Sequence, residues 1–215
     1  MSLLDTSIEF VQSRLSGVDA GHDWTHIERV LALARHIQGS EQKGDLEIIE
    51  LAVIFHDIAD TKFHEGSEND GGNIAFTYLR EKRYPAEKAE QIRDIINSIS
   101  YKHSFENKPG QSIEFQIVQD ADRLDAMGAI GIARAFSYGG FKQREMYNPD
   151  IPPKEYMNTE EYKKSSSPTI NHFYEKLFKL KDLMNTETGK RLAAERHVYM
   201  VEFIKRFKEE WEGNT

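Results

Sequence analysis

A run of apolar residues leads directly into a histidine and an aspartate in the first third of the chain. Leu51 to Phe55 are five apolar residues, and His56 and Asp57 follow at once. Moving an imidazole and a carboxylate out of water costs free energy unless a partner compensates them. A divalent metal ion is one such partner, and a hydrogen-bonded pair at the end of a helix is the simpler alternative. The pair is therefore a candidate half of a metal site that other elements must complete.

A second group of possible ligands lies upstream, where His22 and His26 are four residues apart. Two histidines at this spacing share one face if both are helical. The turn at Gly21 places His22 just before the helix, which favours His26 as the metal ligand and His22, with Asp23, as its neighbour. Neutral imidazole nitrogens bind transition ions at about 2.0–2.1 Å. The alternative for His26 is a core histidine that bonds a backbone carbonyl.

A third group lies downstream and contains two competing aspartates. Asp120 and Asp122 are two residues apart, so they project about 200° apart around a helix and cannot both face one ion. Asp122 borders the apolar face beside Ala121, whereas Asp120 lies farther around, next to Ile117. Helical geometry alone leaves either aspartate possible.

Hydrophobic periodicity indicates that helices position these groups. Apolar residues recur at intervals of three and four along most of the chain, and no segment shows the alternation of a strand, so we expect an all-α fold. Asp45 and Ser112 are suitable N-caps. Residues 141–169 should be irregular, with tyrosines that pack or that form a lid stacking on a base. The predicted helices span residues 5–16, 26–37, 46–58, 73–83, 86–100, 112–125 or 127, 130–136, 169–183 and 189–211.

Composition narrows the function. The chain has 215 residues and no cysteine, so disulfides, thiolate metal sites and cysteine nucleophiles are excluded. The formal net charge of −8 argues against a long nucleic acid as partner, whereas a small phosphorylated substrate remains compatible because a metal carries local positive charge. The sequence has no transmembrane-length apolar run and no signal-peptide pattern at its start, so we expect a cytoplasmic protein without a membrane partner.

The order of these residues resembles the HD superfamily of metal-dependent phosphohydrolases. The resemblance rests on His26, on His56-Asp57 and on the aspartate of Ala121-Asp122-Arg123-Leu124, and it covers residues 20–135. It implies an all-helical bundle that binds one divalent ion through His26, His56, Asp57 and Asp122. It also decides between the two aspartates, because the family's last aspartate follows an alanine and precedes a short motif ending in leucine.

The resemblance implies further roles. Asp60 matches a catalytic acidic residue of related hydrolases and could orient or deprotonate a water, although three residues past Asp57 it could equally be a loop residue. From their positions in the sequence, Arg29, three residues past His26, and Lys62 could bind substrate phosphates. Lys102 and His103, which follow an apolar helix, could line the pocket. Arg29 could instead pair with Asp23.

The segments Asp120–Ala129 and His172–Leu177 further resemble a bacterial subgroup of small stand-alone HD hydrolases. This resemblance implies that the protein acts on nucleotides, including as a nucleoside triphosphate pyrophosphohydrolase. The paired extra histidines of two-metal HD enzymes are missing, so we expect one ion, which could be Mn, Mg, Co, Fe, Ni or Zn, with Mn favoured.

We therefore predict a single domain over residues 1–215, with a metal-site core at about 20–135 and C-terminal helices 169–212 packed on it, as a monomer or homodimer. The predicted function is a metal-dependent phosphohydrolase for a nucleotide or a similar small phosphorylated metabolite. The alternative is a non-catalytic HD module that senses a nucleotide or a metal. The intact ligand set together with Asp60 favours the enzyme.

Overall fold

The computed structural model describes residues 1–15, 24–58, 70–99, 111–155 and 167–214. Throughout these residues the regular structure is helical and no strand occurs, which confirms the all-α prediction. The chain divides into two compact units, Met1–Asp122 and Arg123–Thr215. No helix in these described ranges is long and apolar enough to cross a membrane. The single domain over residues 1–215 stays a prediction.

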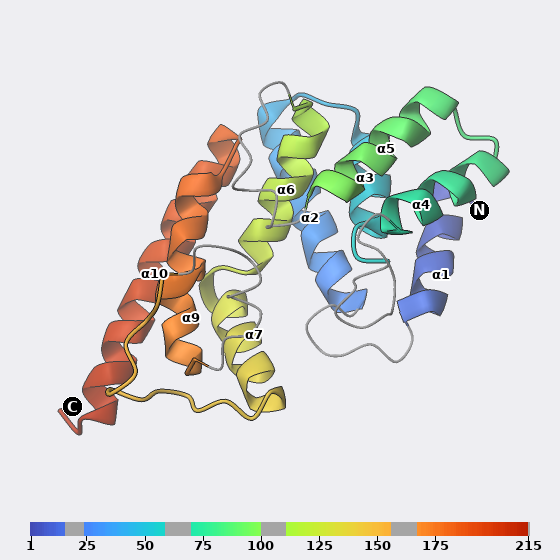
Figure 1. Ribbon diagram of the computed structural model, residues 1–215. Coiled ribbons are helices and arrows are strands. Elements are labelled where there is room, and N and C mark those ends of the chain that lie inside the picture. Colours follow the sequence, from blue (N-terminus) through green and yellow to red (C-terminus); the bar gives the residue numbers. More distant parts are fainter. Residues whose placement is uncertain (16–23, 59–69, 100–110, 156–166, 215) are drawn as a thin grey trace. The chain divides into compact units, whose positions relative to one another are not determined.

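The first unit is organised around α3 (Leu46–Phe55), which packs against four other helices (Figure 1). Ile48, Ile49 and all residues from Leu51 to Phe55 are buried, so this helix is covered on nearly every side. Its neighbours are α1 (Leu3–Leu15), α2 (Trp24–Glu41), α4 (Asp70–Glu81) and α5 (Ala86–Ser98). The helix that leads to His56 is therefore fixed by the core of this unit.

Two predicted caps are present. The Asp45 carboxylate accepts hydrogen bonds from the backbone N–H groups of Glu47 (3.0 Å) and Ile48 (3.4 Å), so it caps α3. Its other oxygen pairs with the Lys88 ammonium at 2.7 Å. Ser112 Oγ accepts from the backbone N–H of Phe115 at 3.2 Å and caps α6 (Ile113–Asp125).

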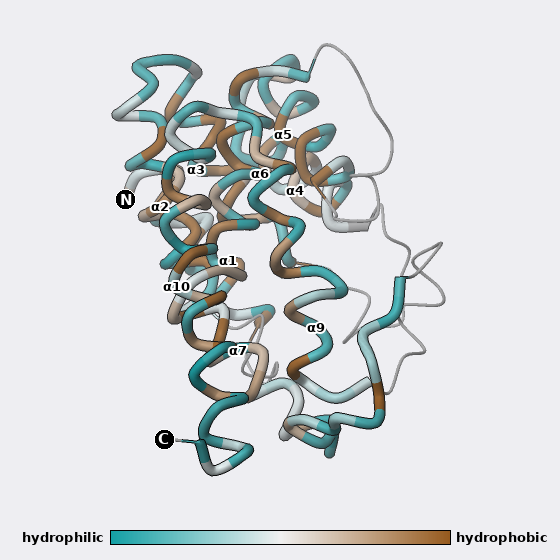
Figure 2. The backbone as a smooth tube through the Cα atoms, turned by 90° about the vertical axis from the view of Figure 1, so that its left-hand side faces the viewer, coloured by the Kyte–Doolittle hydropathy of each residue, from teal (hydrophilic) through white to brown (hydrophobic). Residues whose placement is uncertain are grey.

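The second unit contains α7 (Gly128–Phe141), α9 (Thr169–Glu175), the 3-10 helix η2 (Leu177–Leu183) and α10 (Glu187–Trp211). Figure 2 shows hydrophobic residues recurring between hydrophilic ones along α10, as expected for an amphipathic helix. Its apolar side joins an aromatic cluster in which Phe136 lies 6.2 Å from Phe173 and 5.9 Å from Phe207, between ring centroids.

Several helix boundaries differ from the sequence prediction. Helix α2 runs on through Gly39 to Glu41, whereas we expected an end at Ile37. Helix α3 ends at Phe55 and not at Ile58, because a continuous apolar run does not mark its own end. The segment predicted as one helix over 169–183 is broken at Lys176, whose φ of −138° lies outside the helical range.

Helix α7 also contains two glycines that we expected to follow it. Gly139 and Gly140 both lie inside the helix, which reaches Phe141. A Cβ on Gly139 would overlap Oγ1 of Thr169, so this glycine allows the start of α9 to approach α7 closely. The segment after α7 is irregular as predicted, up to residue 155. Its Tyr147 is half-buried and packs edge-on against Phe207 and Trp211 of the second unit.

Candidate metal centre

Three segments of the first unit bring two histidines and two aspartates together. His26 comes from α2, His56 and Asp57 from the turn that follows α3, and Asp122 from α6. The Nε2 atoms of His26 and His56 are 3.2 Å apart. Asp57 Oδ2 lies 3.4 Å from His26 Nε2 and 3.5 Å from His56 Nε2. Asp122 Oδ1 lies 3.5 and 3.8 Å from the same two nitrogens.

These separations fit a shared ion. With bonds of about 2.1 Å, neighbouring donor atoms lie about 3.4 Å apart around a tetrahedral ion and about 3.0 Å apart around an octahedral one. The five measured separations run from 3.2 to 3.8 Å. Donor atoms of His26, His56 and Asp122 all lie within 4.8 Å of one another, and these three residues form a possible metal site. Asp57 Oδ2 lies within the same distance of both histidines.

The orientation of the His56 ring also fits a shared ion. Its Nδ1 lies 2.7 Å from the carbonyl oxygen of Val53, one turn earlier in α3. A carbonyl only accepts hydrogen bonds, so Nδ1 carries the proton and the Nε2 lone pair faces Asp57, Asp122 and His26. A metal-binding histidine is commonly held in this way by a hydrogen bond from its other nitrogen. The Val53 carbonyl is the contact that sequence reasoning missed, because a backbone group leaves no residue-type signal.

The histidines of this site are more deeply buried than its aspartates. The side chains of His26 and His56 are 1% and 2% exposed, whereas those of Asp57 and Asp122 are 15% and 35% exposed. Burial raises the pKa of the Asp122 carboxyl. The hydrogen bond with His26 lowers that pKa, as do the positive charges that His56 and His26 carry when they are protonated, and the pKa falls to about 2. Asp122 is therefore an anion near neutral pH, and the aspartate side of the site is the side open to solvent.

One of the two aspartates of α6 lies with the histidines in the structure. Asp122 groups with the two histidines, whereas Asp120 does not belong to this group and is fully buried. The choice that the family resemblance implied is thus the one that the geometry supports.

The remaining predicted residues are placed as follows. Arg29 is half-buried in α2, and its guanidinium donates to Oγ1 of Thr25, one turn earlier, at 3.2 Å. Its role in phosphate binding stays a prediction. The other predicted residues lie outside the described ranges; they are His22, Asp23, Asp60, Lys62, Lys102 and His103.

A known protein family matches the part of the chain that contains this site. The family model of the HD domain matches residues 23–127, which include all four donor residues. The uncharacterized protein YpgQ of Bacillus subtilis (strain 168) is 36% identical over 205 residues, which cover 95% of this chain and 91% of YpgQ.

Solved structures resemble the chain over nearly its full length. A protein from Lactobacillus plantarum is 38% identical with a TM-score of 0.84, over 99% of both chains. An HD-superfamily hydrolase from Bacillus thuringiensis is 42% identical with a TM-score of 0.76, over 97% of this chain and 96% of that one. YpgQ in complex with ADP is 36% identical with a TM-score of 0.73, over 96% of this chain and 94% of that one. With its matching domain, its full-length relatives and its cluster of His26, His56 and Asp122, the chain belongs to the HD superfamily.

Proposed function

We propose that this protein is a metal-dependent phosphohydrolase that acts on a nucleotide or a similar small phosphorylated metabolite. The observation that carries the proposal is a pair of imidazole nitrogens 3.2 Å apart, with one carboxylate oxygen of Asp57 and one of Asp122 each 3.4–3.8 Å from both nitrogens. His26, His56, Asp57 and Asp122 are the proposed ligands of one divalent ion. This mixed nitrogen and oxygen set suits first-row transition ions, of which we favour Mn²⁺.

The chemistry follows from the donor set. When bound, a divalent ion polarises a phosphoryl oxygen and lowers the pKa of a water molecule. The Val53 carbonyl keeps the His56 ring in the tautomer whose Nε2 can bind a cation. Asp57 and Asp122 supply negative charge on the open side of the site. We further propose that Asp60 orients or deprotonates the attacking water, and that Arg29, Lys62, Lys102 and His103 bind substrate phosphates, with His22 and Asp23 supporting His26.

A nucleotide is the favoured substrate because a close relative binds one. YpgQ, which is 36% identical over nearly the full chain, has been crystallised with ADP. A small substrate also suits the net charge of −8, which disfavours a long polyanion. Within this class we propose nucleoside triphosphates, cleaved to monophosphate and pyrophosphate, as the first substrates to test.

The experiment is a product assay on chelator-treated protein. Nucleoside mono-, di- and triphosphates are incubated without metal and with Mn²⁺, Mg²⁺ or Co²⁺, and phosphate and pyrophosphate are measured separately. Pyrophosphate release from triphosphates supports the pyrophosphohydrolase proposal, whereas phosphate release from monophosphates retains the phosphohydrolase and reassigns the bond. No turnover with any metal contradicts the proposal and favours the non-catalytic sensing module.

A further inference from the structure

The last turn of α6, which carries Asp122, ends in a backbone carbonyl that a distant arginine binds. The last four carbonyl groups of a helix have no partner within the helix. Leu124, two residues after Asp122, contributes one of them. Its oxygen accepts a hydrogen bond from the Arg196 guanidinium of α10 and another from the backbone N–H of Met127 at 3.0 Å. Arg196 therefore acts as a side-chain cap for the end of α6.

The side chain of Arg196 is partly enclosed by its neighbours. Its side chain is half-buried, and burial lowers the pKa of its guanidinium while the charges of Asp125 and Glu195 raise it. Gly128 packs against the arginine stem: a Cβ on Gly128 would lie 3.0 Å from Cγ of Arg196. The φ of Gly128 is +70°, a left-handed conformation that glycine adopts without strain. The chain thus turns sharply after α6 and leaves room for the arginine stem.

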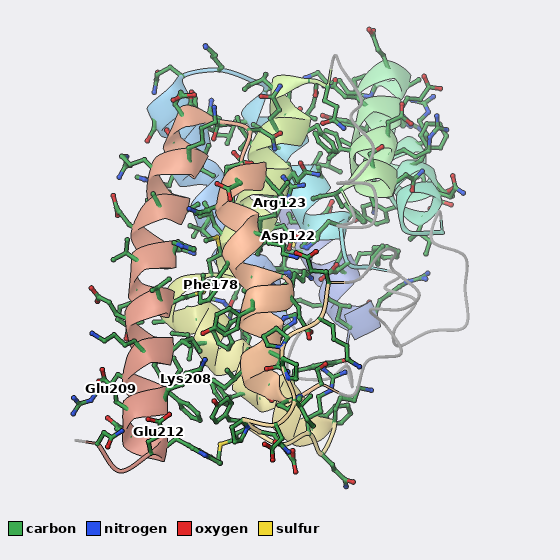
Figure 3. All side chains as sticks on the ribbon, turned by 60° about the vertical axis from the view of Figure 1, so that its left-hand side comes forward. Asp122, Arg123, Phe178, Lys208, Glu209 and Glu212 are labelled. Carbon is green, nitrogen blue, oxygen red and sulfur yellow. The ribbon has the colours of Figure 1, made fainter. Side chains whose placement is uncertain are left out.

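Two further guanidinium contacts fix the same turn. Arg123, the residue after Asp122, donates to the carbonyl oxygen of Leu183 at the end of η2. Asp125, whose side chain is 2% exposed, pairs with Arg134 of α7 at 2.5 Å. All three contacts lie within the second unit, and they tie residues 123–125 to α10, η2 and α7. Figure 3 labels Asp122 and Arg123 as neighbours on α6.

These contacts bear on the metal centre because α6 is one continuous helix from Ile113 to Asp125. A capped last turn keeps residues 122–125 helical, and the helical backbone sets the direction in which the Asp122 side chain leaves α6. A ligand oxygen must stand within about 2.2 Å of its ion, so this direction matters for binding. We propose that Arg196 is a positioning residue for the metal centre: it holds the last turn of α6 so that Asp122 keeps its ligand geometry. Arg196 touches neither ion nor substrate in this role, and the inference rests on the metal centre proposed above.

A purely structural role for Arg196 makes a different prediction. If the arginine only stabilises the second unit, its loss lowers the stability of metal-free and metal-loaded protein equally and leaves the affinity for metal unchanged. If it positions Asp122, its loss weakens metal binding at temperatures where the variant is fully folded.

The test measures Mn²⁺ affinity by calorimetric titration of chelator-treated protein. The variant is Arg196→Met, which keeps an apolar stem and removes every donor. The matched control is Arg206→Met on the same helix, because Arg206 is 63% exposed and pairs with Glu210 one turn away. Circular dichroism checks that each variant is folded at the titration temperature. We expect Arg196→Met to weaken Mn²⁺ binding roughly tenfold, the effect typical of residues that orient a metal ligand. Arg206→Met should bind as the wild type does.

Unchanged affinity in a folded Arg196→Met protein overturns the inference and leaves the proposed function intact. Absence of Mn²⁺ binding by the wild type overturns the metal centre itself, so the two failures are distinguishable. If Arg196→Met does not fold, the comparison is made with Arg196→Lys. Lysine keeps the charge but lacks the guanidinium fork. Weaker Mn²⁺ binding by folded Arg196→Lys supports the positioning role, and unchanged Mn²⁺ affinity overturns it.

Discussion

The Nε2 atoms of His26 and His56 lie 3.2 Å apart, although the two residues are 30 positions apart in the sequence. The nitrogen of His56 is an acceptor, because its Nδ1 proton is directed to Val53 O. Carboxylate oxygens of Asp57 and Asp122 lie within 3.8 Å of both nitrogens. A divalent cation bound among these nitrogen and oxygen atoms is a partner that compensates all four of them together.

Metal binding should stabilise the folded chain. An ion that binds only the native state raises the free energy of unfolding by about 2.7 kcal/mol when its concentration is 100 times its Kd. We expect Mn²⁺ to raise the thermal midpoint of chelator-treated protein, measured by scanning calorimetry. His56→Ala should abolish this rise because it removes a nitrogen donor. A variant that is stabilised by Mn²⁺ as fully as the wild type would show that the ion binds elsewhere.

Asp122→Asn should remove activity while keeping the fold. The substitution preserves shape but replaces an anionic oxygen with a neutral amide, so we expect turnover of the identified substrate to fall roughly 100-fold or more. Asp94→Asn is the control, because the Asp94 side chain lies on α5 and is 71% exposed. Steady-state rates at saturating Mn²⁺ make the comparison. Equal rates for Asp122→Asn and the wild type would exclude Asp122 as a ligand.

Two adjacent glycines of α7 should respond oppositely to alanine. Gly139→Ala places a methyl group on Thr169 Oγ1, and such overpacking costs about 1–3 kcal/mol. Gly140 has nothing within 4 Å of the position of an added Cβ, so Gly140→Ala should stabilise the helix by about 0.5–1 kcal/mol. Urea unfolding measures both changes. Equal stability of the Gly139→Ala and Gly140→Ala proteins would contradict this prediction.

The Asp45 cap should make stability depend on pH in a defined direction. The hydrogen bond from Lys88 lowers the pKa of Asp45 from 3.8, burial opposes this, and the N–H groups of Ile48 and Glu47 lower it further. A carboxyl whose pKa is lower in the folded state contributes stability above its unfolded pKa, and the contribution is lost as the pH falls toward the folded pKa. We expect Asp45→Ala to cost about 1 kcal/mol at neutral pH. The difference from wild type should shrink as the pH falls from about 5 to about 3. Urea unfolding across this range measures it, and a constant difference would show that the carboxylate charge contributes nothing.

The sequence predicted which segments are helical better than where they end. The apolar run before His56 identified α3, but every residue from Leu51 to Phe55 fits a helix equally well, so nothing in the run marked Phe55 as the last one. Gly139 and Gly140 suggested that the helix ends before them, yet both lie inside α7. A glycine is needed at position 139 because the start of α9 approaches the helix there. The break at Lys176 likewise lies inside a segment whose apolar spacing continues across it, so periodicity did not mark it.

The candidate site was predicted in part from residue types and in part from resemblance. His56 and Asp57 stood out because polar residues that follow a buried run need a partner. Helical geometry alone left Asp120 and Asp122 open, whereas the family resemblance implied Asp122, which the folded chain groups with His26 and His56. Arg196 carried no signal at all, since its contact is with the backbone of Leu124, 72 residues away in the sequence.

We propose that one ion at His26, His56, Asp57 and Asp122 makes this chain a hydrolase. The most direct measurement titrates Mn²⁺ into chelator-treated protein and follows, in the same samples, the bound ion by electron paramagnetic resonance and the hydrolysis of the nucleotide identified by the product assay. The account predicts that both signals rise together and saturate at about one ion per chain. Full hydrolysis before any ion is bound, or complete binding without hydrolysis, would contradict it.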